Sequence, residues 1–291
     1  MLDFIINPIA GGKGGKKTKK VVSILDKILL EKKVEFCFHF TTHKGHAKEL
    51  TKTLIDGGAT DIIVVGGDGT LHEVINGFTN FDKINLGLIP CGTGNDFACA
   101  VNIPLDAEKA LNIVLTEKPK FVDFMQLGCV RGINIIGTGI DVDVLKRYNK
   151  LKKKTKFNYT GCLIKTLFNF NYTEFSAKID NKEKNYRSFI ACVANGHVYG
   201  GGIPVCPPAN PTDNKLNFVA VRSMPKLKII GAFLKLKKGK ILSLKQAEHF
   251  ECQKVSINTS EPCTINVDGE LYENLPFDVE IVSNTLKMYR K

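Results

Sequence analysis

The sequence predicts a chain of two domains, an α/β domain with a parallel sheet followed by an all-β sandwich. Strand-like and helix-like segments alternate over the first third of the chain, which is typical of βαβ units. Glycine-rich turns follow several of the predicted strands. After about residue 120, helical periodicity largely gives way to short β-prone runs separated by turn residues, the pattern of a sandwich. The predicted domains are 1–122 and 123–291, with the last residues able to return to the first domain.

Each element of the first domain has its own signal. Apolar runs predict strands at 2–8, 34–40, 61–67 and 84–90, and the third run is continuous enough for a strand buried on both faces. Apolar residues at helical spacing predict helices at 18–33, 46–58, 71–78 and 105–118. Gly57 and Gly58 mark the end of the second helix.

The second domain shows β-prone runs at 120–128, 133–139, 175–180, 188–196, 215–223, 254–260, 263–270 and 277–283. Two stretches, 145–169 and 225–245, interrupt the strands with lysines and apolar residues and are predicted as amphipathic helices.

Composition restricts the class of protein. The chain has 291 residues with 41 Lys+Arg and 29 Asp+Glu, so its formal net charge is +12, which favours an anionic partner. No apolar run reaches the roughly 18 residues of a spanning helix, and the N-terminus lacks the order of a secretory signal. Nine scattered cysteines without a C-x-x-C pair argue against a zinc site and against a disulfide framework. We therefore expect a cytoplasmic protein with free thiols.

The strongest motif is Gly66-Gly67-Asp68-Gly69-Thr70, between a predicted strand and a predicted helix. Glycines at such a turn let the backbone approach a phosphate, and the helix start favours an anion. A carboxylate there suits a Mg²⁺ ion between Asp68 and the phosphate. The alternative is an ordinary strand-to-helix turn.

Gly92-Thr93-Gly94-Asn95-Asp96-Phe97 follows the next predicted strand. Open α/β sheets place their ligands at the carboxyl ends of strands, so the two loops are expected to share a site. Asp96 then shares the metal or orients the acceptor. The alternative role for Asn95 or Asp96 is a helix cap.

Asn7 and Pro8 precede a third loop that contains Gly11, Gly12 and Lys13. It matches neither the P-loop nor the dinucleotide fingerprint, and it is interpreted as a basic, phosphate-facing loop or a solvated one. Thr41 with Gly45 is a weaker candidate, and His43 with His46 is interpreted as a solvated pair. Asp268-Gly269-Glu270 is either a hairpin turn or a pair of carboxylates for phosphoryl transfer.

Taken in order, these motifs resemble the diacylglycerol kinase catalytic-domain family, most closely its bacterial lipid kinases. Gly137-x-Gly139-x-Asp141 and Asn195 before Gly200-Gly201-Gly202 complete the ordered set, which spans nearly the whole chain. The resemblance implies a nucleotide-binding domain like those of phosphofructokinases and NAD kinases, a lipid-binding β-sandwich, and an active site in the cleft between them.

The resemblance also implies roles for individual residues. ATP would be surrounded by residues of the three loops: Asn7, Gly11, Gly12, Lys13, Thr41, Gly66, Gly67, Asp68, Gly69, Thr70, Leu71, His72, Gly92, Thr93 and Asn95. Asp68 and Asp96 would organise the catalytic Mg²⁺, and Asp268 or Glu270 would accept the proton of a lipid hydroxyl. A structural Mg²⁺ site of the family is altered here, because the segment is Asp213-Asn214-Lys215-Leu216-Asn217; its remaining participants would be Asn210, Asp213 and Lys215.

The predicted function is an ATP-dependent lipid kinase with a diacylglycerol-like acceptor. The alternatives are a kinase of a soluble substrate, as in NAD kinases, and a non-catalytic nucleotide- or lipid-binding regulator. No nucleic-acid-binding signature is present, and a homodimer is left open.

The lysine clusters predict peripheral docking on an anionic membrane. The basic residues are Lys146, Arg147, Lys150, Lys152, Lys153, Lys154 and Lys156, then Lys226, Lys228, Lys235, Lys237, Lys238 and Lys240. The apolar residues expected to insert beside them are Phe157, Leu167, Phe168, Phe170, Ile229, Ile230 and Phe233.

Overall fold

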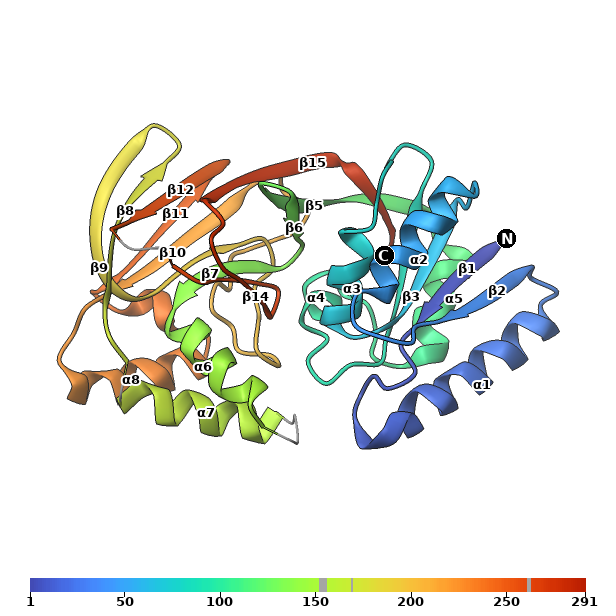
Figure 1. Ribbon diagram of the computed structural model, residues 1–291, viewed down its shortest axis with the longest axis horizontal. Helices are drawn as coiled ribbons and strands as arrows, with labels where there is room; N and C mark the ends of the chain where they lie inside the picture. Colours follow the sequence, from blue (N-terminus) through green and yellow to red (C-terminus); the bar gives the residue numbers. More distant parts are fainter. Residues whose placement is uncertain (152–155, 169, 261–262) are drawn as a thin grey trace. The chain divides into compact units, whose positions relative to one another are not determined.

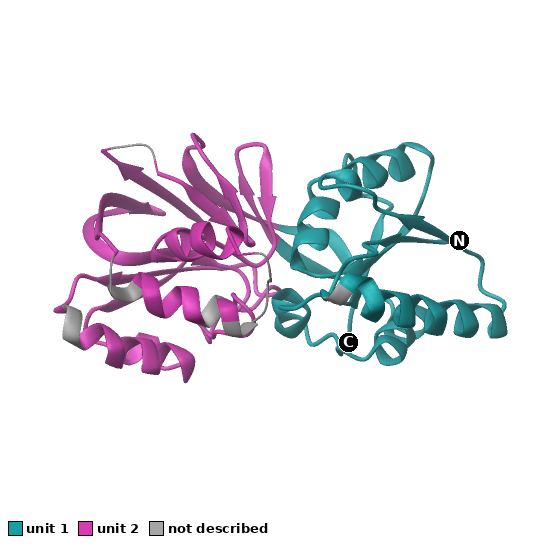
Figure 2. Ribbon diagram, turned by 60° about the horizontal axis from the view of Figure 1, so that its bottom comes forward, with its two compact units in different colours: residues 1–123, 283–291 teal, residues 124–282 magenta. Residues whose placement is uncertain are grey.

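The computed structural model describes residues 1–151, 156–168, 170–260 and 263–291. It divides into two units, Met1–Asp123 with Ser283–Lys291 and Phe124–Val282 (Figure 2). The sequence predicts a boundary between residues 122 and 123, and the structure divides between 123 and 124. The last nine residues belong to the first unit.

Unit 1 is built on parallel strands. They are β1 (Leu2–Ile6), β2 (Phe36–Phe40), β3 (Asp61–Gly66) and β4 (Asn85–Pro90). The strand order is β2-β1-β3-β4, and the end of β15 (Phe277–Tyr289) pairs in parallel with β4. The apolar run at 62–65 is fully buried, because both faces of the sheet are covered by helices.

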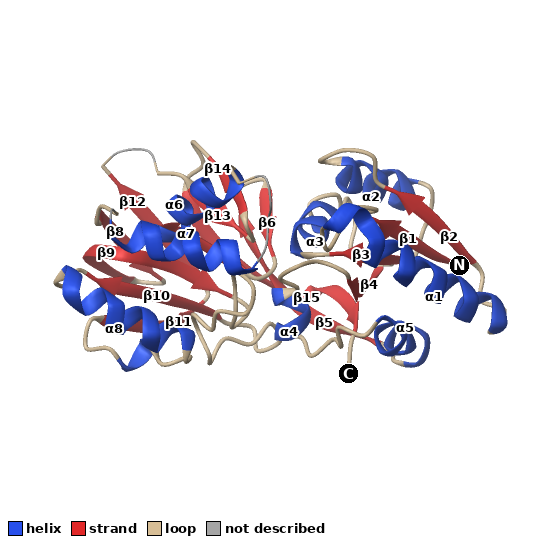
Figure 3. Ribbon diagram, turned by 90° about the horizontal axis from the view of Figure 1, so that it is seen from below, coloured by secondary structure: helices blue, strands red, loops and turns tan. Residues whose placement is uncertain are grey.

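Helices connect the strands of unit 1. They are α1 (Lys16–Glu31), α2 (His46–Asp56), α3 (Asp68–Ile75), α4 (Asp96–Ala100) and α5 (Ala107–Thr116). α1 packs against α5 and α2 against α3, and the two pairs lie on opposite faces of the sheet (Figure 3). The buried side chains of α1 recur at helical spacing and form the stripe that its sequence predicts. The short helix α4 shows no helical period, because five residues are too few, and its sequence signal is the possible helix cap at Asn95, which is its N-cap residue.

Unit 2 consists mainly of antiparallel strands. β5 (Pro119–Leu127) enters it from unit 1, and the others are β6 (Val130–Gly132), β7 (Ile135–Gly139), β8 (Thr173–Ile179), β9 (Lys182–Ala194), β10 (Leu216–Arg222), β11 (Ala247–Cys252), β12 (Lys254–Thr259), β13 (Ile265–Val267) and β14 (Glu270–Tyr272). The order is β14-β13-β7-β9-β8-β12-β15, and β10 pairs with β9 and β11. β11 was not predicted from the sequence.

Three helices cover one face of the unit 2 strands: α6 (Ile140–Asn149), α7 (Lys156–Phe168) and α8 (Lys226–Lys237) (Figure 1). Alternate residues of β10 face two different cores. Phe218 and Ala220 pack among strands, whereas Val219 and Val221 pack toward the helices. Residues 218–221 of β10 are therefore a continuous apolar run, because both faces of the strand are buried.

The nine cysteines are all free of disulfides, and five of them are buried. Among the described residues, no helix combines the length and the apolar character needed to cross a bilayer.

Candidate active site

The glycine-rich turns of unit 1 lie at the carboxyl ends of its parallel strands. The chain leaves β1 for β2 on one side and later places β3 on the other, so the strand order reverses between β1 and β3. Open α/β sheets bind their ligands at such a switch point. Asn7 follows β1 and Gly67 follows β3, so the predicted loops converge on this edge.

Carboxylates cap two of the helices that begin at this edge. Glu73 accepts the N–H groups of Gly45 at 2.8 Å and Ala47 at 3.2 Å, at the start of α2. Asp68 accepts the N–H groups of Asn95 at 2.7 Å and Phe97 at 3.2 Å, at the start of α4. These bonds satisfy helix N–H groups that otherwise have no partner within the helix.

The two helices at the switch point, α1 and α3, both have a glycine as their N-cap residue. Gly15 precedes α1 and Gly67 precedes α3, so neither N-cap residue has a side chain that could bond the first helical N–H groups. A helix N-terminus with a glycine cap presents backbone N–H groups and a partial positive charge. The N-termini of α1 and α3 are therefore the ones suited to a phosphate.

The loops that follow β3 and β4 touch backbone to backbone. A Cβ atom on Gly67 would lie 2.8 Å from the Cα atom of Gly92, a separation that real Cβ atoms essentially never show. The N–H groups of Cys91 and Gly92 both donate to the carbonyl of Gly66, at 2.7 and 3.2 Å. Only glycine permits this approach at positions 67 and 92.

Two carboxylates meet beside Gly94. A Cβ atom on Gly94 would lie 2.8 Å from Asp68 Oδ2 and 3.4 Å from Asp96 Oδ2. Asp96 is 7% exposed. Asp68 and Asp96, predicted to share a metal, are thus brought together by the fold.

Asn95, whose N–H donates to Asp68, adds a side-chain amide beside these two carboxylates. It adopts a left-handed conformation (φ 57°), and its Nδ2 donates to the carbonyl of Gly92 at 3.0 Å. Its Oδ1 is buried and accepts no hydrogen bond from the described residues. A buried acceptor of this kind normally has a partner, which a ligand, ion or water would supply here.

The segment that follows β1 is hydrogen-bonded to residues that follow β3 and β4. Asn7 Nδ2 donates to Thr70 Oγ1 at 3.0 Å, and Lys17 Nζ reaches the carbonyl of Gly92 at 3.5 Å. Gly11 and Gly12 both have positive φ angles. The side chain of Lys13 is outside what the structure describes.

The remaining residues predicted to surround the nucleotide differ in exposure. Thr93 and Gly69 are exposed and Thr41 is 9% exposed, at the end of β2. Leu71 and His72 are only 1% and 3% exposed, because this side of α3 packs into the unit. A nucleotide at this edge would meet the backbone at 67–69 before either of these side chains.

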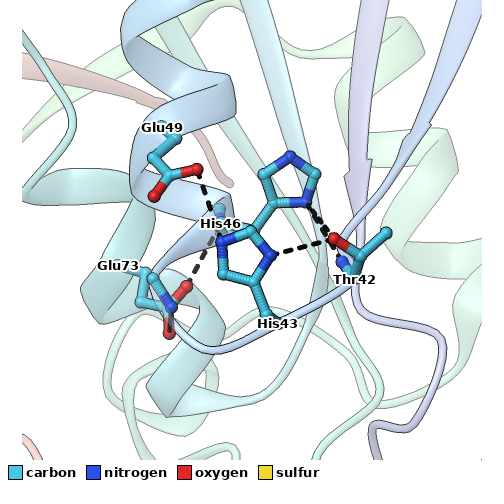
Figure 4. Close-up of polar contacts among 7 residues, drawn as sticks. Thr42, His43, His46, Glu49 and Glu73 are labelled. Atoms are coloured by element: carbon cyan, nitrogen blue, oxygen red, sulfur yellow. Dashed lines mark hydrogen bonds and ion pairs between the residues drawn. The ribbon is translucent and has the colours of Figure 1, made fainter.

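His43 and His46 stack on each other at the start of α2 (Figure 4). Their ring centroids are 4.8 Å apart with an interplanar angle of 13°. The N–H of Thr42 donates to His46 Nδ1 at 3.1 Å, and His43 Nε2 lies 3.5 Å from Glu49 Oε2. The two rings thus bring together the ends of the segment 43–46, in which the N–H of Gly45 donates to Glu73.

In unit 2, Asp268 and Gly269 form the two-residue turn between β13 and β14. Both residues have positive φ angles (53° and 97°), and Val267 pairs with Glu270. The D-G step therefore forms a hairpin turn, which was one of the two interpretations of the sequence.

The Asp268 carboxylate accepts hydrogen bonds from the backbone. It accepts the N–H groups of Ile133 at 2.7 Å, Asn134 at 2.9 Å and Ile135 at 3.0 Å. Such an arrangement holds the hairpin to the start of β7. Glu270 follows at the start of β14, and both Asp268 and Glu270 are partly exposed.

Asn266 and Asp141 form a buried pair that is hydrogen-bonded to the same hairpin. Asn266 Oδ1 accepts the N–H of Gly269 at 2.8 Å, and Asn266 Nδ2 donates to Asp141 Oδ2 at 3.0 Å. Asp141 is 2% exposed, and its Oδ1 has no hydrogen-bond partner among the described residues. Burial raises the pKa of Asp141 to about 6.

The altered metal segment keeps its turn. Asn214 has a left-handed φ of 60°, as expected for a residue that replaces glycine. Lys215 donates its N–H to Asp213 Oδ1 at 3.1 Å, and its ammonium pairs with Glu251 at 2.5 Å. Asn210 Oδ1 accepts from Thr212 at 2.9 Å. A structural Mg²⁺ at Asn210, Asp213 and Lys215 stays a prediction.

Unit 2 also contains a small apolar cavity of about 20 Å³. Every lining residue is aliphatic or aromatic: Ile140, Leu163, Phe189, Ile190, Tyr199, Val205, Val219, Val221, Ile229, Ala232, Phe233, Leu236 and Ile241. The cavity lies between strands of the sheet and helices α6, α7 and α8. The cavity could not be predicted from the sequence, because a cavity wall and a filled core use the same residue types.

Two residues of these sites were missed by sequence reasoning. Glu73 and Asn266 act through backbone contacts that only the fold creates.

Comparison with known proteins gives a consistent result. The profile of the diacylglycerol kinase catalytic domain matches residues 2–127, and that of the YegS C-terminal NAD kinase beta sandwich-like domain matches residues 134–290. "Putative lipid kinase YtlR" of Bacillus subtilis is 29% identical, and the match covers 94% of each chain. "Putative lipid kinase SA0681" of Staphylococcus aureus is 26% identical over 88% of this chain and 82% of its own.

Solved structures show the same fold. A crystal structure titled as a putative diacylglycerol kinase from Bacillus anthracis superposes with a TM-score of 0.81 at 23% identity, covering 100% of this chain and 96% of its own. An NAD kinase from Archaeoglobus fulgidus in complex with ATP gives a TM-score of 0.54 at 12% identity, covering 100% and 94%.

Proposed function

The chain belongs to the family that joins a diacylglycerol kinase catalytic domain to a YegS-type C-terminal domain, and from this we propose that it is an ATP-dependent lipid kinase. The reaction transfers the γ-phosphate of ATP to the hydroxyl of a diacylglycerol-like lipid. The observation that carries the choice of a lipid is the match of both domains, since a relative that spans nearly the whole chain is named a putative lipid kinase. We place the acyl chain at the small cavity of unit 2, whose wall is entirely aliphatic or aromatic, because an acyl chain needs no polar groups in its pocket.

The nucleotide is assigned to the strand-end loops of unit 1. Its phosphates face the glycine-capped N-termini of α1 and α3. Phosphoryl transfer depends on positioning and on charge neutralisation rather than on covalent help from the protein. The backbone contact between Gly67 and Gly92 keeps the two loops in one arrangement, and this fixes the donors before the nucleotide binds.

The residues around Gly94 fit a Mg²⁺ ion. Asp68 and Asp96 bring two carboxylates to one corner, and Asn95 Oδ1 is a buried oxygen without a donor among the described residues. Oxygen ligands of these types are the ones Mg²⁺ prefers. Asp68 already accepts two N–H groups, yet a carboxylate has about four acceptor positions. When bound there, Mg²⁺ would neutralise charge on the phosphates.

We assign the general base to Glu270 rather than to Asp268. The Asp268 carboxylate already accepts three backbone N–H groups. Glu270 follows the fixed turn and is partly exposed. Accepting the proton of the lipid hydroxyl is worth roughly 10²–10⁴-fold in rate.

The lipid reaches the enzyme at a membrane surface through α8. This helix contains no acidic residue, and its exposed side chains include Ile230 (49%), Leu234 (54%) and several lysines. Its opposite side, with Ile229, Ala232 and Leu236, lines the cavity. One helix thus offers apolar and cationic contacts outward to an anionic bilayer and an apolar wall inward.

Burial corrects part of the expected membrane surface. Phe170 and Ile229 are 4% and 2% exposed and pack into the core, and Phe233 is only partly exposed. Ile164 on α7 is 43% exposed and joins Ile230 and Leu234 instead. Helical period alone could not choose the buried face, because both faces of α8 carry apolar residues. The side chains of Lys152, Lys153, Lys154, Lys156, Phe157, Leu167, Phe168 and Lys226 lie outside the described part of the chain.

The alternatives are a kinase of a soluble substrate and a regulator without activity. The NAD kinase neighbour supports the shared fold alone at 12% identity. The deciding experiment is transfer of labelled phosphate from ATP with Mg²⁺ to a panel of acceptors: diacylglycerol, a sphingoid base, phosphatidylglycerol, an undecaprenol-like alcohol and NAD. Organic-extractable label that is absent with Glu270→Gln supports the lipid kinase. Label on NAD supports the soluble alternative, and no transfer with bound nucleotide supports the regulator.

A further inference from the structure

A second group of metal-binding side chains lies in unit 1 on the first two strands. Asp3 on β1 is the direct register partner of Cys37 on β2, and His39 lies two residues further on β2. Residues two apart on a strand share a face, so the three side chains project together. One ligand atom from each lies within 4.8 Å of the other two, among the described residues searched.

The environment of Asp3 is unusual for a strand of a parallel sheet. Its side chain is 3% exposed, and its neighbours Phe4, Ile5 and Ile6 are fully buried apolar residues. A buried carboxylate needs a cation or hydrogen-bond donors to offset its lost hydration. His39 Nε2 lies 2.9 Å from Asp3 Oδ1, which supplies one partner and leaves the thiol of Cys37 beside the pair.

We propose that Asp3, Cys37 and His39 form a binding site for a zinc ion, with water as the fourth ligand. Carboxylate oxygen, thiolate sulfur and imidazole nitrogen are the three donor types that zinc takes in proteins. Zn–O, Zn–N and Zn–S bonds of about 2.0–2.3 Å in a tetrahedron put ligand atoms roughly 3.3–3.6 Å apart. His39 Nε2 and Asp3 Oδ1, now 2.9 Å apart, would separate by a few tenths of an ångström, and side-chain rotations of up to about 1 Å would bring atoms that lie within 4.8 Å to these distances.

The ion has a route to the site. β2 stands at the end of the strand order of unit 1, and Cys37 and the His39 ring are partly exposed, the latter by 22%. Asp3 is then the inner ligand, and the two outer ligands come from a strand with one paired edge. Zinc would join β2 to β1 through side chains as well as through the ladder.

The site also explains why sequence spacing argued against zinc. A C-x-x-C pair places two ligands on one turn of chain, whereas here 34 positions separate Asp3 from Cys37 and parallel pairing closes the gap. This site is separate from the strand-end loops of the proposed kinase, so neither proposal depends on the other.

The test uses the full chain, freed of metal with a chelator and titrated with Co²⁺ as a spectroscopic substitute for zinc. A tetrahedral site with one thiolate gives a sulfur-to-cobalt charge-transfer band at one equivalent, and added Zn²⁺ removes it stoichiometrically. Cys37→Ser is expected to abolish the band and to weaken Zn²⁺ binding at least about ten-fold. Asp3→Asn keeps a hydrogen-bonding partner for His39 but removes the carboxylate, and it is expected to weaken Zn²⁺ binding likewise.

The controls separate this site from other thiols. Cys99→Ser and Cys129→Ser change exposed cysteines and are expected to keep both the band and the affinity. Thermal unfolding checks that every variant is folded, and Zn²⁺ is expected to raise the Tm of the wild type more than that of Cys37→Ser. A missing band in the folded wild type, or a band that survives in Cys37→Ser, would overturn the proposal and leave Asp3 and His39 as a hydrogen-bonded pair.

Discussion

Asn266 donates a hydrogen bond to Asp141 over 3.0 Å, and both side chains are at most 3% exposed. The other end of the same amide accepts the N–H of Gly269. A buried acid is thereby linked, through one amide, to the turn that precedes Glu270. The first prediction concerns this acid.

Replacing Asp141 with Asn is expected to change how stability depends on pH. Burial raises the pKa of Asp141 from 3.8 to about 6 in the folded chain. Between pH 3.8 and about pH 6 the unfolded chain releases the proton of Asp141, whereas the folded chain retains it. The free energy of unfolding of the wild type therefore falls as the pH rises through this range. Above about pH 6 the stabilising contribution of the protonated acid is fully lost. Relative to wild type, Asp141→Asn should therefore gain about 2 kcal/mol between pH 4.5 and pH 7.5. Urea unfolding at both pH values measures it, and a gap independent of pH would contradict the buried acid.

Asp268 and Glu270 are expected to fail in different ways. Glu270→Gln should lower kcat by about 10²–10⁴-fold, because it removes the proposed base while keeping the size and shape of the side chain. Asp268→Asn should lower the free energy of unfolding by about 1–3 kcal/mol, because the NH2 group of asparagine would face backbone N–H groups that now donate to the carboxylate. Kinetics and urea unfolding of both variants provide the check. A stable but inactive Asp268→Asn, beside an active Glu270→Gln, would reverse the assignment.

Gly92→Ala should disrupt the contact between the two strand-end loops. The added methyl group meets the backbone of Gly67, so we expect a loss of about 1–3 kcal/mol in stability, as for overpacking, together with weaker ATP binding. Gly231→Ala is the matched control, because a Cβ there meets nothing within 4 Å and helix propensity favours alanine by roughly 1 kcal/mol. Nucleotide titration calorimetry and thermal unfolding measure both effects; equal behaviour of the two variants would rule out the close approach.

Ala232→Leu should fill the small cavity of unit 2 from the α8 side and displace its wall. We expect lower turnover of long-chain diacylglycerol and a smaller effect on a short-chain analogue, with ATP binding unchanged. Assays in neutral detergent micelles remove any contribution from membrane charge. Lys235→Gln, on the exposed side of the same helix, is expected to behave as wild type. Chain-length preference identical in Ala232→Leu and wild type would place the acyl chain elsewhere.

Ile230→Ser combined with Leu234→Ser should weaken binding to anionic vesicles at least about ten-fold, since burying such a side chain contributes roughly 1.5–3 kcal/mol. Leu30→Ser, at an exposed position (63%) on α1 of unit 1, is the control. Vesicle co-sedimentation with increasing anionic lipid and increasing salt measures the effect. Binding that ignores lipid charge and salt would argue against this surface.

Much of the fold was predictable because local patterns were strong. The buried run at 62–65, the stripe of α1 and the D-G turn each specify an element without help from distant residues. β11 and α4 were missed, because their signals are short, and the insertion of Phe170 and Ile229 into a membrane was wrong, because an apolar residue does not reveal whether it faces a core or solvent.

The sequence by itself determined the order of strands and helices, the glycine-rich turns and the family resemblance, since these depend on residue type and spacing along the chain. Only the tertiary structure decided which groups meet. It tied the Asp68 carboxylate to the loop at 92–97, held Asp268 with three backbone donors, joined Asp141 to Asn266, and aligned Asp3, Cys37 and His39. The physical reason is that strand pairing and helix packing set distances between residues far apart in sequence, and those distances decide hydrogen bonding, burial and metal coordination.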